Sequence, residues 1–279
     1  MSVKGYDTVD QLKTQAKVNV LLNDTGWHSA IFFVGRYLTS VNSYEKRLAN
    51  GEVELLSANG INIVSLYEKD PTSLSDYSIS HAEEDVVDAI SKAAYYHQPN
   101  GTPIYFCIDA PLDYTDPNVI SVVKAYIARI KTRLSSSSYN PKGYTLGVYG
   151  PETVCIALKN QYSSIYTIKG NPQTGAMTNH TIKQTYVNPS NYPTYNGITI
   201  PVDHCTARVS SYGGWQYHNF TGSWKNYNSP TWHRRKCSMC NQYERQPHTP
   251  NAAGTRCTVC GYEGPMETPQ YTGEDDEIE

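Results

Sequence analysis

Three carboxylate side chains each follow a short apolar stretch, and they are the residues of this sequence best suited to chemistry. They are Asp7, Glu68 and Asp109, and the stretches before them are residues 3–6, 63–67 and 104–108. Each stretch has the composition of a buried strand. The carboxyl ends of parallel strands in a β/α barrel meet at one face, where catalytic residues lie. Because two carboxyl groups across a pocket are the machinery of glycoside hydrolysis, the pattern predicts a glycan-cleaving site.

The most specific local signal is a pair of CxxC motifs near the C-terminus. They are Cys237-x2-Cys240 and Cys257-x2-Cys260, with 16 residues between the inner cysteines. This spacing is typical of a zinc ribbon, in which four thiolates complete the tetrahedral shell of a structural site. We expect all four cysteines to bind one Zn²⁺, which would stabilise a module too small to fold alone. Two disulfide bonds are the alternative.

Histidines and basic residues surround these cysteines. We expect His233 and His248 to be exposed, with a place in or next to the metal shell as the alternative. The basic residues predict a positive surface, and they are Arg234, Arg235, Lys236, Arg245 and Arg256. We expect this surface to dock to a protein partner or to have a structural role. Binding of an anionic polymer, nucleic acid or cell-wall glycan, is the alternative.

Charge and hydropathy exclude two classes of partner. The 279 residues have a net charge of −3, which argues against a nucleic-acid-binding protein. No stretch approaches the roughly 18 apolar residues of a membrane span. The sequence enters its first strand at residue 3 without a signal peptide. We therefore expect synthesis in the cytoplasm and action at the cell wall, after release or as a phage or particle component.

Apolar stretches alternate with amphipathic segments, which predicts a parallel sheet covered by helices. Ser80 and Glu83 form a capping box before one helix, and Asp116-Pro117 begins another. Beyond residue 160 no strong helical pattern is present, so the last third should be irregular. We predict an α/β fold with a (β/α)8 TIM-like barrel over residues 1–225, a linker over 226–230, a four-cysteine zinc ribbon over 231–265 and a disordered acidic tail over 266–279.

Short motifs spread over residues 3–217 resemble a known family. They are Gly5-Tyr6-Asp7, Gly35-Arg36-Tyr37-Leu38, Lys46-Arg47-Leu48, Ile104–Asp109, Gly147-Val148-Tyr149-Gly150, Gln184, Val202-Asp203 and Gly213-Gly214-Trp215. In this order they resemble a bacterial glycoside-hydrolase-like domain related to the muramidases that cut the glycan strand of peptidoglycan. The resemblance implies a β/α barrel, a peptidoglycan-type polysaccharide substrate and a lysozyme- or endolysin-type role.

The resemblance also implies roles for individual acids. Asp7 and Asp109 match the acids that end the first and fourth strands of muramidases. The general-acid Glu expected two residues after Asp109 is Pro111 in this sequence, so Glu68 or Asp113 would replace it. We hypothesise that Glu68 is the general acid, Asp109 the nucleophile or electrostatic partner, and Asp7 the residue that orients the substrate. One of these carboxyl groups must stay protonated near neutral pH.

Polar and aromatic side chains are expected to line the sugar site, and they are Arg36, Tyr67, Tyr149, Gln184, Asp203 and Trp215. If every acid is held in a salt bridge, the barrel is instead a glycan-binding module or a scaffold. A third interpretation places the function in the ribbon, with the barrel as a platform in a larger assembly.

Overall fold

The structure is a computed structural model that describes residues 2–27, 32–39, 46–158, 164–168, 180–208, 211–239 and 242–267. The chain divides into two compact units. The N-terminal unit contains residues 1–56 and 60–217, and the C-terminal unit contains residues 57–59 and 218–279.

The N-terminal unit is built on a strongly curled sheet whose strands close in the order β1-β10-β7-β6-β5-β4-β3-β2. The strands are β1 (Val3–Asp7), β2 (Phe32–Leu38), β3 (Asn62–Tyr67), β4 (Pro103–Cys107), β5 (Thr145–Pro151), β6 (Ser164–Ile168), β7 (Ile182–Thr185) and β10 (Asp203–Ala207). Strands β1 to β7 pair in parallel, whereas β10 is antiparallel to both β1 and β7.

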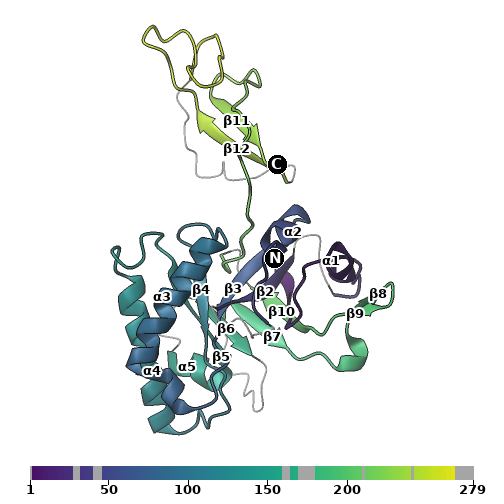
Figure 1. The fold of residues 1–279 in the computed structure, drawn as a ribbon, viewed down its shortest axis with the longest axis vertical. Helices are drawn as coiled ribbons and strands as arrows, with labels where there is room; N and C mark the ends of the chain where they lie inside the picture. The colour runs from purple at the N-terminus through teal and green to yellow at the C-terminus, as the bar shows by residue number, and fades with distance from the viewer. Residues whose placement is uncertain are drawn as a thin grey trace. The chain divides into compact units, whose positions relative to one another are not determined.

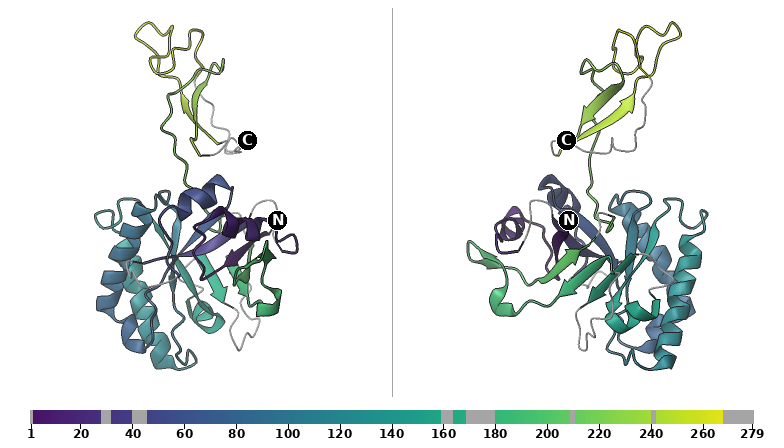
Figure 2. Two further views of the ribbon diagram at one scale, coloured as in Figure 1. Left: turned by 45° about the vertical axis from the view of Figure 1, so that its right-hand side comes forward. Right: turned by 180° about the vertical axis from the view of Figure 1, so that it is seen from behind.

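Five α-helices in the described part each follow one of the first five strands (Figure 1). They are α1 (Gln15–Leu22), α2 (Glu52–Ala58), α3 (Ile79–Tyr95), α4 (Pro117–Leu134) and α5 (Glu152–Leu158). Helices α3 and α4 lie side by side outside the sheet (Figure 2).

The complete (β/α)8 barrel predicted from the sequence is not found in the described residues. No described α-helix follows β6 or β7, and the last strand of the sheet, β10, runs antiparallel to its neighbours. Between β7 and β10 the chain forms a 3-10 turn, η2 (Pro189–Asn191), and a hairpin of β8 (Thr194–Tyr195) and β9 (Ile198–Thr199). This segment contains prolines and the hairpin turn Asn196-Gly197, which break a helix. The prediction of a mixed α/β fold is confirmed, and the last third of this unit is irregular, as expected from the sequence.

Local sequence signals account for the starts of the two long helices. The predicted start of α4 is confirmed, because the Asp116 side chain accepts a hydrogen bond from Asn118 N and Pro117 occupies the first turn. The predicted capping box of α3 is wrong. That helix begins after Ser78, which accepts from His81 N, while Glu83 pairs with Arg129 and Arg133 of α4.

Aromatic rings fill the inside of the sheet, and their packing determines where the tyrosine hydroxyl groups lie. A Cβ at Gly5 would come within 2.6 Å of the Phe33 ring, and one at Gly147 within 2.6 Å of the Tyr105 ring. Glycine is therefore required at both positions, since interior packing leaves no room for a methyl group. Tyr37 and Tyr149 belong to the same buried cluster, so their hydroxyl groups are held by the core.

The C-terminal unit is a two-stranded hairpin, β11 (Trp232–Lys236) and β12 (Tyr243–Pro247), followed by loops. The linker expected at residues 226–230 lies inside this unit. Lys225 and Arg234 exchange backbone hydrogen bonds of 2.8 and 3.2 Å, and Ser229 Oγ accepts from the backbone N–H groups of Thr231 and Trp232. The predicted acidic tail lies outside the described residues from position 268 onward.

Candidate functional site

Asp7 ends β1 and forms the centre of a buried polar cluster. Its carboxylate accepts hydrogen bonds from Tyr37 Oη at 3.2 and 3.3 Å, from Tyr149 Oη at 3.3 Å and from Gln184 Nε2 at 3.2 Å. The donors come from β2, β5 and β7, so the closure of the sheet brings them together. Strand alternation directs these side chains to the inside of the sheet.

Asp203, the first residue of β10, is the carboxylate neighbour of Asp7. Asp203 accepts from Gln184 Nε2 at 3.0 Å and from Val187 N at 3.1 Å. Burial and the negative charge of Asp203 raise the pKa of Asp7 to about 7, against the opposing effects of Tyr37 and Lys46. This carboxyl group therefore exchanges its proton near neutral pH.

Asp109 follows β4 and has Glu68 as its carboxylate neighbour. Burial and the Glu68 charge raise the pKa of Asp109 to about 7, although Lys46 acts in the opposite direction. Lys46 Nζ lies 3.4 Å from Glu68 Oε1, and the Glu68 side chain is 3% exposed. Two acids with a raised pKa, each beside a second carboxylate, are thus present in this unit.

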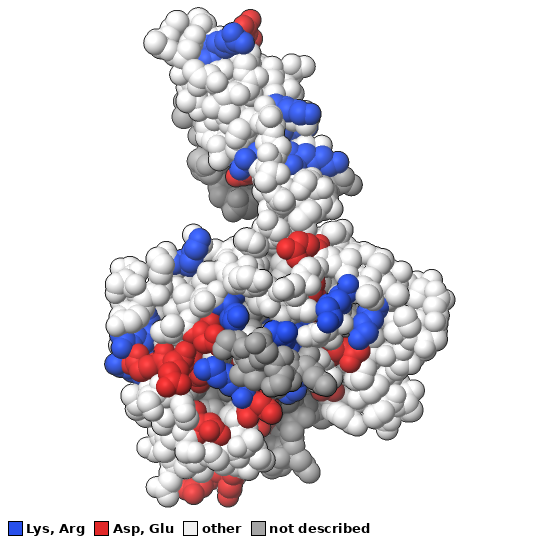
Figure 3. Space-filling view, in the orientation of Figure 1, with Lys and Arg blue, Asp and Glu red and all other residues white. Residues whose placement is uncertain are grey.

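Asp7 and Asp109 both line one cavity of about 310 Å³, which we call the acid hollow. Its other lining residues include Tyr37, Lys46, Tyr149, Gln184, Tyr186, Tyr192 and Asp203. In Figure 3 acidic and basic side chains lie intermingled on the visible face of the N-terminal unit, and no single charge dominates there.

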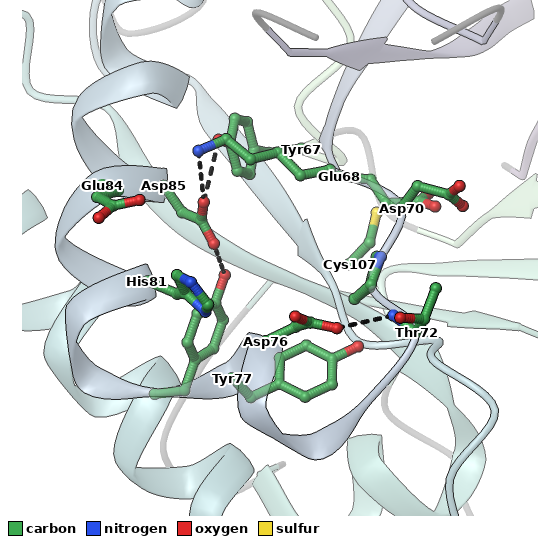
Figure 4. Close-up of a pocket in the computed structure, with 13 residues that line it drawn as sticks. Tyr67, Glu68, Asp70, Thr72, Asp76, Tyr77, His81, Glu84, Asp85 and Cys107 are labelled. Carbon is green, nitrogen blue, oxygen red and sulfur yellow. Dashed lines mark hydrogen bonds and ion pairs between the residues drawn. The ribbon is translucent and has the colours of Figure 1, made fainter. Parts of the chain in front are cut away.

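Glu68 lines a second cavity of about 280 Å³, which we call the α3 hollow (Figure 4). Lys69 Nζ pairs with Asp85 Oδ1 at 2.9 Å, and Tyr126 Oη donates to Asp85 Oδ2 at 2.7 Å. Tyr67 Oη donates to Asp85 at 3.3 Å. Because Lys46 lines the acid hollow and pairs with Glu68, this ion pair lies at the boundary of the two hollows.

The structure places the predicted sugar-contacting residues in different surroundings. Tyr149, Gln184 and Asp203 line the acid hollow, and Tyr67 lines the α3 hollow. Arg36 and Trp215 line neither.

Arg36 is fully buried and pairs with Glu52 at 2.7 Å, which ties β2 to α2. Trp215 Nε1 donates to Ser65 Oγ at 2.9 Å, and its backbone pairs with Ile63 near the start of β3. That position is the opposite end of the strand from Glu68. Both side chains therefore hold the fold together and line neither hollow.

The acid hollow is also lined by residues that were not predicted from the sequence as site residues, among them Tyr37, Lys46, Tyr186 and Tyr192. Tyr37 and Lys46 stand within motifs that carry the family resemblance, so a signal for them was present. Tyr186 directly follows β7 and is 61% exposed, unusual for a large aromatic ring beside a cavity. An exposed tyrosine just after a strand end is the pattern that would have identified it.

The C-terminal unit brings four potential metal ligands together. His233 Nδ1 lies 3.5 Å from Cys257 Sγ, and His248 Nδ1 lies 3.5 Å from Cys260 Sγ. All four ligand atoms lie within 4.8 Å of one another, so this cluster can hold a metal ion. The expectation that both histidines are exposed is wrong, because His233 is 1% and His248 9% exposed.

Of the other two predicted cysteine ligands, the structure describes one, Cys237, and it does not belong to that cluster. Cys237 is buried but is not among the four clustered ligands, and Cys240 lies outside the described residues. Burial alone would favour the neutral thiol of Cys257, but hydrogen bonds from the backbone of Cys260 and Val259 outweigh it and lower the pKa of Cys257 to about 5.

Residues 25–257 match the Rv2525c-like, glycoside hydrolase-like domain family. The chain belongs to this family. Among curated proteins it is 30% identical over 150 residues to the uncharacterized protein YbfG of Bacillus subtilis strain 168. That alignment covers 51% of this chain and 20% of YbfG, so the chain spans about a fifth of that relative's length.

Two solved structures are similar to this chain. The crystal structure of the Tat-secreted protein Rv2525c of Mycobacterium tuberculosis, in complex with HEPES, aligns with a TM-score of 0.56 and 16% identity over 77% of this chain and 98% of that one. The modular autolysin LytC of Streptococcus pneumoniae, solved with a synthetic peptidoglycan ligand, aligns with a TM-score of 0.42 and 14% identity over 74% of this chain and 46% of LytC.

One expectation about the origin of the protein is corrected by this comparison. The sequence led us to expect cytoplasmic synthesis without a signal peptide and later release. The similar protein Rv2525c is Tat-secreted, and this overturns that expectation. Among the helices that the structure describes, none has both the length and the apolar character needed to cross a bilayer.

Proposed function

We propose that the N-terminal unit hydrolyses a glycosidic bond of a polysaccharide in the acid hollow. The observation that carries this proposal is that Asp7 and Asp109, from two separate strands, line one cavity and both have a pKa raised to about 7. Glycoside hydrolysis needs one protonated and one ionised carboxyl group across the scissile bond. Membership of a glycoside hydrolase-like family supports the same chemistry.

The surroundings of the two acids suggest their roles. Three hydrogen-bond donors, Tyr37, Tyr149 and Gln184, point at Asp7 and stabilise its carboxylate form. The neighbouring Glu68 charge raises the pKa of Asp109 above its ordinary value and so favours the protonated form. We therefore assign Asp109 as the general acid and Asp7 as the carboxylate that acts as base or nucleophile. This replaces the sequence-based assignment of Glu68 as the acid, and Glu68 becomes a residue that tunes Asp109.

Aromatic side chains support a sugar as the occupant. Tyr186 and Tyr192 line the acid hollow next to Asp203, and a tyrosine ring offers an apolar face with a hydroxyl edge. Such rings stack on the apolar face of a pyranose. For the specific polymer we propose peptidoglycan, in the lysozyme- or endolysin-type role that the motif resemblance implies, with the muramidase relationship as part of the proposal.

For the C-terminal unit we propose a structural Zn²⁺ and a docking role toward a protein partner. The clustered histidine and cysteine ligands support a metal of this kind, since imidazole and thiolate are the ligands that Zn²⁺ takes in structural sites.

A non-catalytic, glycan-binding or scaffolding role is the second candidate, and one observation favours it. Pro111 stands where related muramidases carry their general acid, and Glu68 is held in an ion pair with Lys46. In that case the acid hollow would bind a glycan without cleaving it.

Digestion of purified peptidoglycan by the wild type, Asp109→Asn and Glu68→Gln distinguishes the two candidates. Binding to the same material is measured in parallel by co-sedimentation. We expect new reducing ends from the wild type, their loss in Asp109→Asn with binding retained, and partial activity in Glu68→Gln. Binding without new reducing ends in the wild type would support the non-catalytic role. If the wild type shows no binding and no cleavage, both proposals are rejected for this polymer.

A further inference from the structure

We infer that the C-terminal unit binds one tetrahedral Zn²⁺ through two histidines and two cysteines and that the unit folds only around this ion. The ligand atoms are Nδ1 of His233, Nδ1 of His248, Sγ of Cys257 and Sγ of Cys260. Cys237 lies outside this coordination shell. The inference concerns the C-terminal unit alone and does not depend on any activity of the acid hollow.

The distances between the ligand atoms fit a tetrahedral zinc shell. With Zn–N of about 2.0–2.1 Å, Zn–S of about 2.3 Å and a tetrahedral angle, N and S ligands lie about 3.6 Å apart. The two measured Nδ1–Sγ distances, His233 to Cys257 and His248 to Cys260, are both 3.5 Å. The remaining pairs lie within 4.8 Å, so small rotations of the side chains complete the shell.

A hydrogen bond prepares His248 for metal binding. Its Nε2 lies 2.9 Å from the backbone carbonyl oxygen of Ser229, an acceptor to which only a protonated nitrogen can donate. The neutral ring then carries its lone pair on Nδ1, which faces Cys260. Metal-binding histidines in proteins are oriented in this way by their second nitrogen. His233 is held by packing instead, with its ring centroid 4.6 Å from that of Trp224.

The position of Cys237 separates it from the ion. Cys237 comes four residues after His233, and β11 extends over Trp232–Lys236 between them. At about 3.3 Å per residue the two α-carbons are about 13 Å apart. A four-cysteine shell would need Cys237 to meet Cys257, whereas Cys257 is in contact with His233 at the other end of the strand.

The described residues of the unit form no apolar core that would replace the ion. Among the described residues from 218 to 267, those classed as buried are His233, Cys237, His248 and Cys257, and none is aliphatic or aromatic hydrocarbon. Three of these four are proposed ligands. A unit of this size with no fully buried hydrocarbon side chain among its described residues gains too little from apolar burial to offset its chain entropy, so metal binding must supply the stability.

Metal analysis and a cobalt spectrum of the full chain test this inference. We expect about one Zn²⁺ per chain by elemental analysis. After replacement by Co²⁺ we expect the d–d bands of a tetrahedral site, with thiolate charge-transfer intensity for two sulfur ligands. The spectrum uses the unmodified protein, so it does not depend on whether a variant folds. Intensity for four thiolates, or no bound metal, would overturn the inference.

Matched variants test the ligand set. His233→Ala and Cys257→Ser should each lose at least nine-tenths of the bound zinc, and Cys237→Ser should retain it. Limited proteolysis reports the fold: chelation should expose sites between residues 218 and 267 while the N-terminal unit stays intact. Zinc loss in Cys237→Ser together with retention in His233→Ala would contradict the proposed shell. Unchanged protease resistance after complete removal of zinc would contradict metal-dependent folding.

Discussion

Asp7 and Asp203 lie directly opposite each other on the antiparallel strands β1 and β10, and Gln184 Nε2 lies 3.2 Å from one carboxylate and 3.0 Å from the other. The amide can donate one proton to each carboxylate, which holds two like charges at a short separation. This arrangement depends on the antiparallel direction of β10, because the strand begins where β1 ends. The antiparallel strand β10 therefore brings Asp203 into the acid hollow.

Asp203→Asn should shift the acidic limb of the pH–rate profile. The Asp203 charge raises the pKa of Asp7, so its removal lowers that pKa below about 7. If ionised Asp7 is the base or nucleophile, kcat/KM on peptidoglycan should stay at its maximum down to a lower pH in the variant than in the wild type. The measurement is the pH dependence of kcat/KM for both proteins. An acidic limb that does not move would remove Asp7 from that role.

Two substitutions around Asp109 should move the alkaline limb of the pH profile of kcat/KM in opposite directions. Glu68→Gln removes a negative charge that raises the pKa of Asp109, so the limb should fall to lower pH. Lys46→Met removes a positive charge that lowers the pKa, so the limb should rise. The same pH series reports both. Equal profiles, or shifts of the same sign, would show that Asp109 is not the general acid.

Asp109→Asn should stabilise the folded protein at alkaline pH. The folded-state pKa of about 7 lies above the ordinary value of 3.8, so folding favours the protonated carboxyl. The stability that this group contributes is fully present below about pH 4 and is lost as the pH rises through 7. The variant removes that loss. We expect a higher Tm at pH 8, by about 2–4 °C per kcal/mol of relieved repulsion, and no gain at pH 4. Calorimetry at both pH values checks this, and an equal gain at pH 4 would exclude a charge effect.

The strand ends were predictable from the sequence, whereas the direction of the last strand was not. Apolar stretches before Asp7, Glu68 and Asp109 indicate buried strands, and side chains at their ends face one rim because parallel strands share a direction. Nothing in the composition of β10 distinguishes a parallel from an antiparallel strand. That choice depends on the connection from β7, residues 186–202, which forms η2 and the β8–β9 hairpin in place of a crossover helix.

Burial of charged residues was the main obstacle to predicting the site. Arg36 stands in a strand whose seven residues are all buried, and its ion pair with the distant Glu52 compensates the buried charge. The two CxxC motifs raise a similar difficulty. Spacing shows which residues can bind a metal, but the β11–β12 hairpin decides that His233 and not Cys237 meets Cys257.

Tyr186→Ala should weaken binding of the glycan with little effect on the chemical step. The ring is 61% exposed at the acid hollow, so its removal costs stacking energy without disturbing the core. Aromatic contacts contribute about 0.5–1.5 kcal/mol, so we expect KM to rise about 2- to 12-fold at unchanged kcat. Tyr195→Ala is the matched control, because Tyr195 is 36% exposed on β8 and does not line the hollow. Equal effects of the two substitutions on KM would mean that Tyr186 has no specific contact with the sugar, and a loss of kcat alone would place its role in the reaction step.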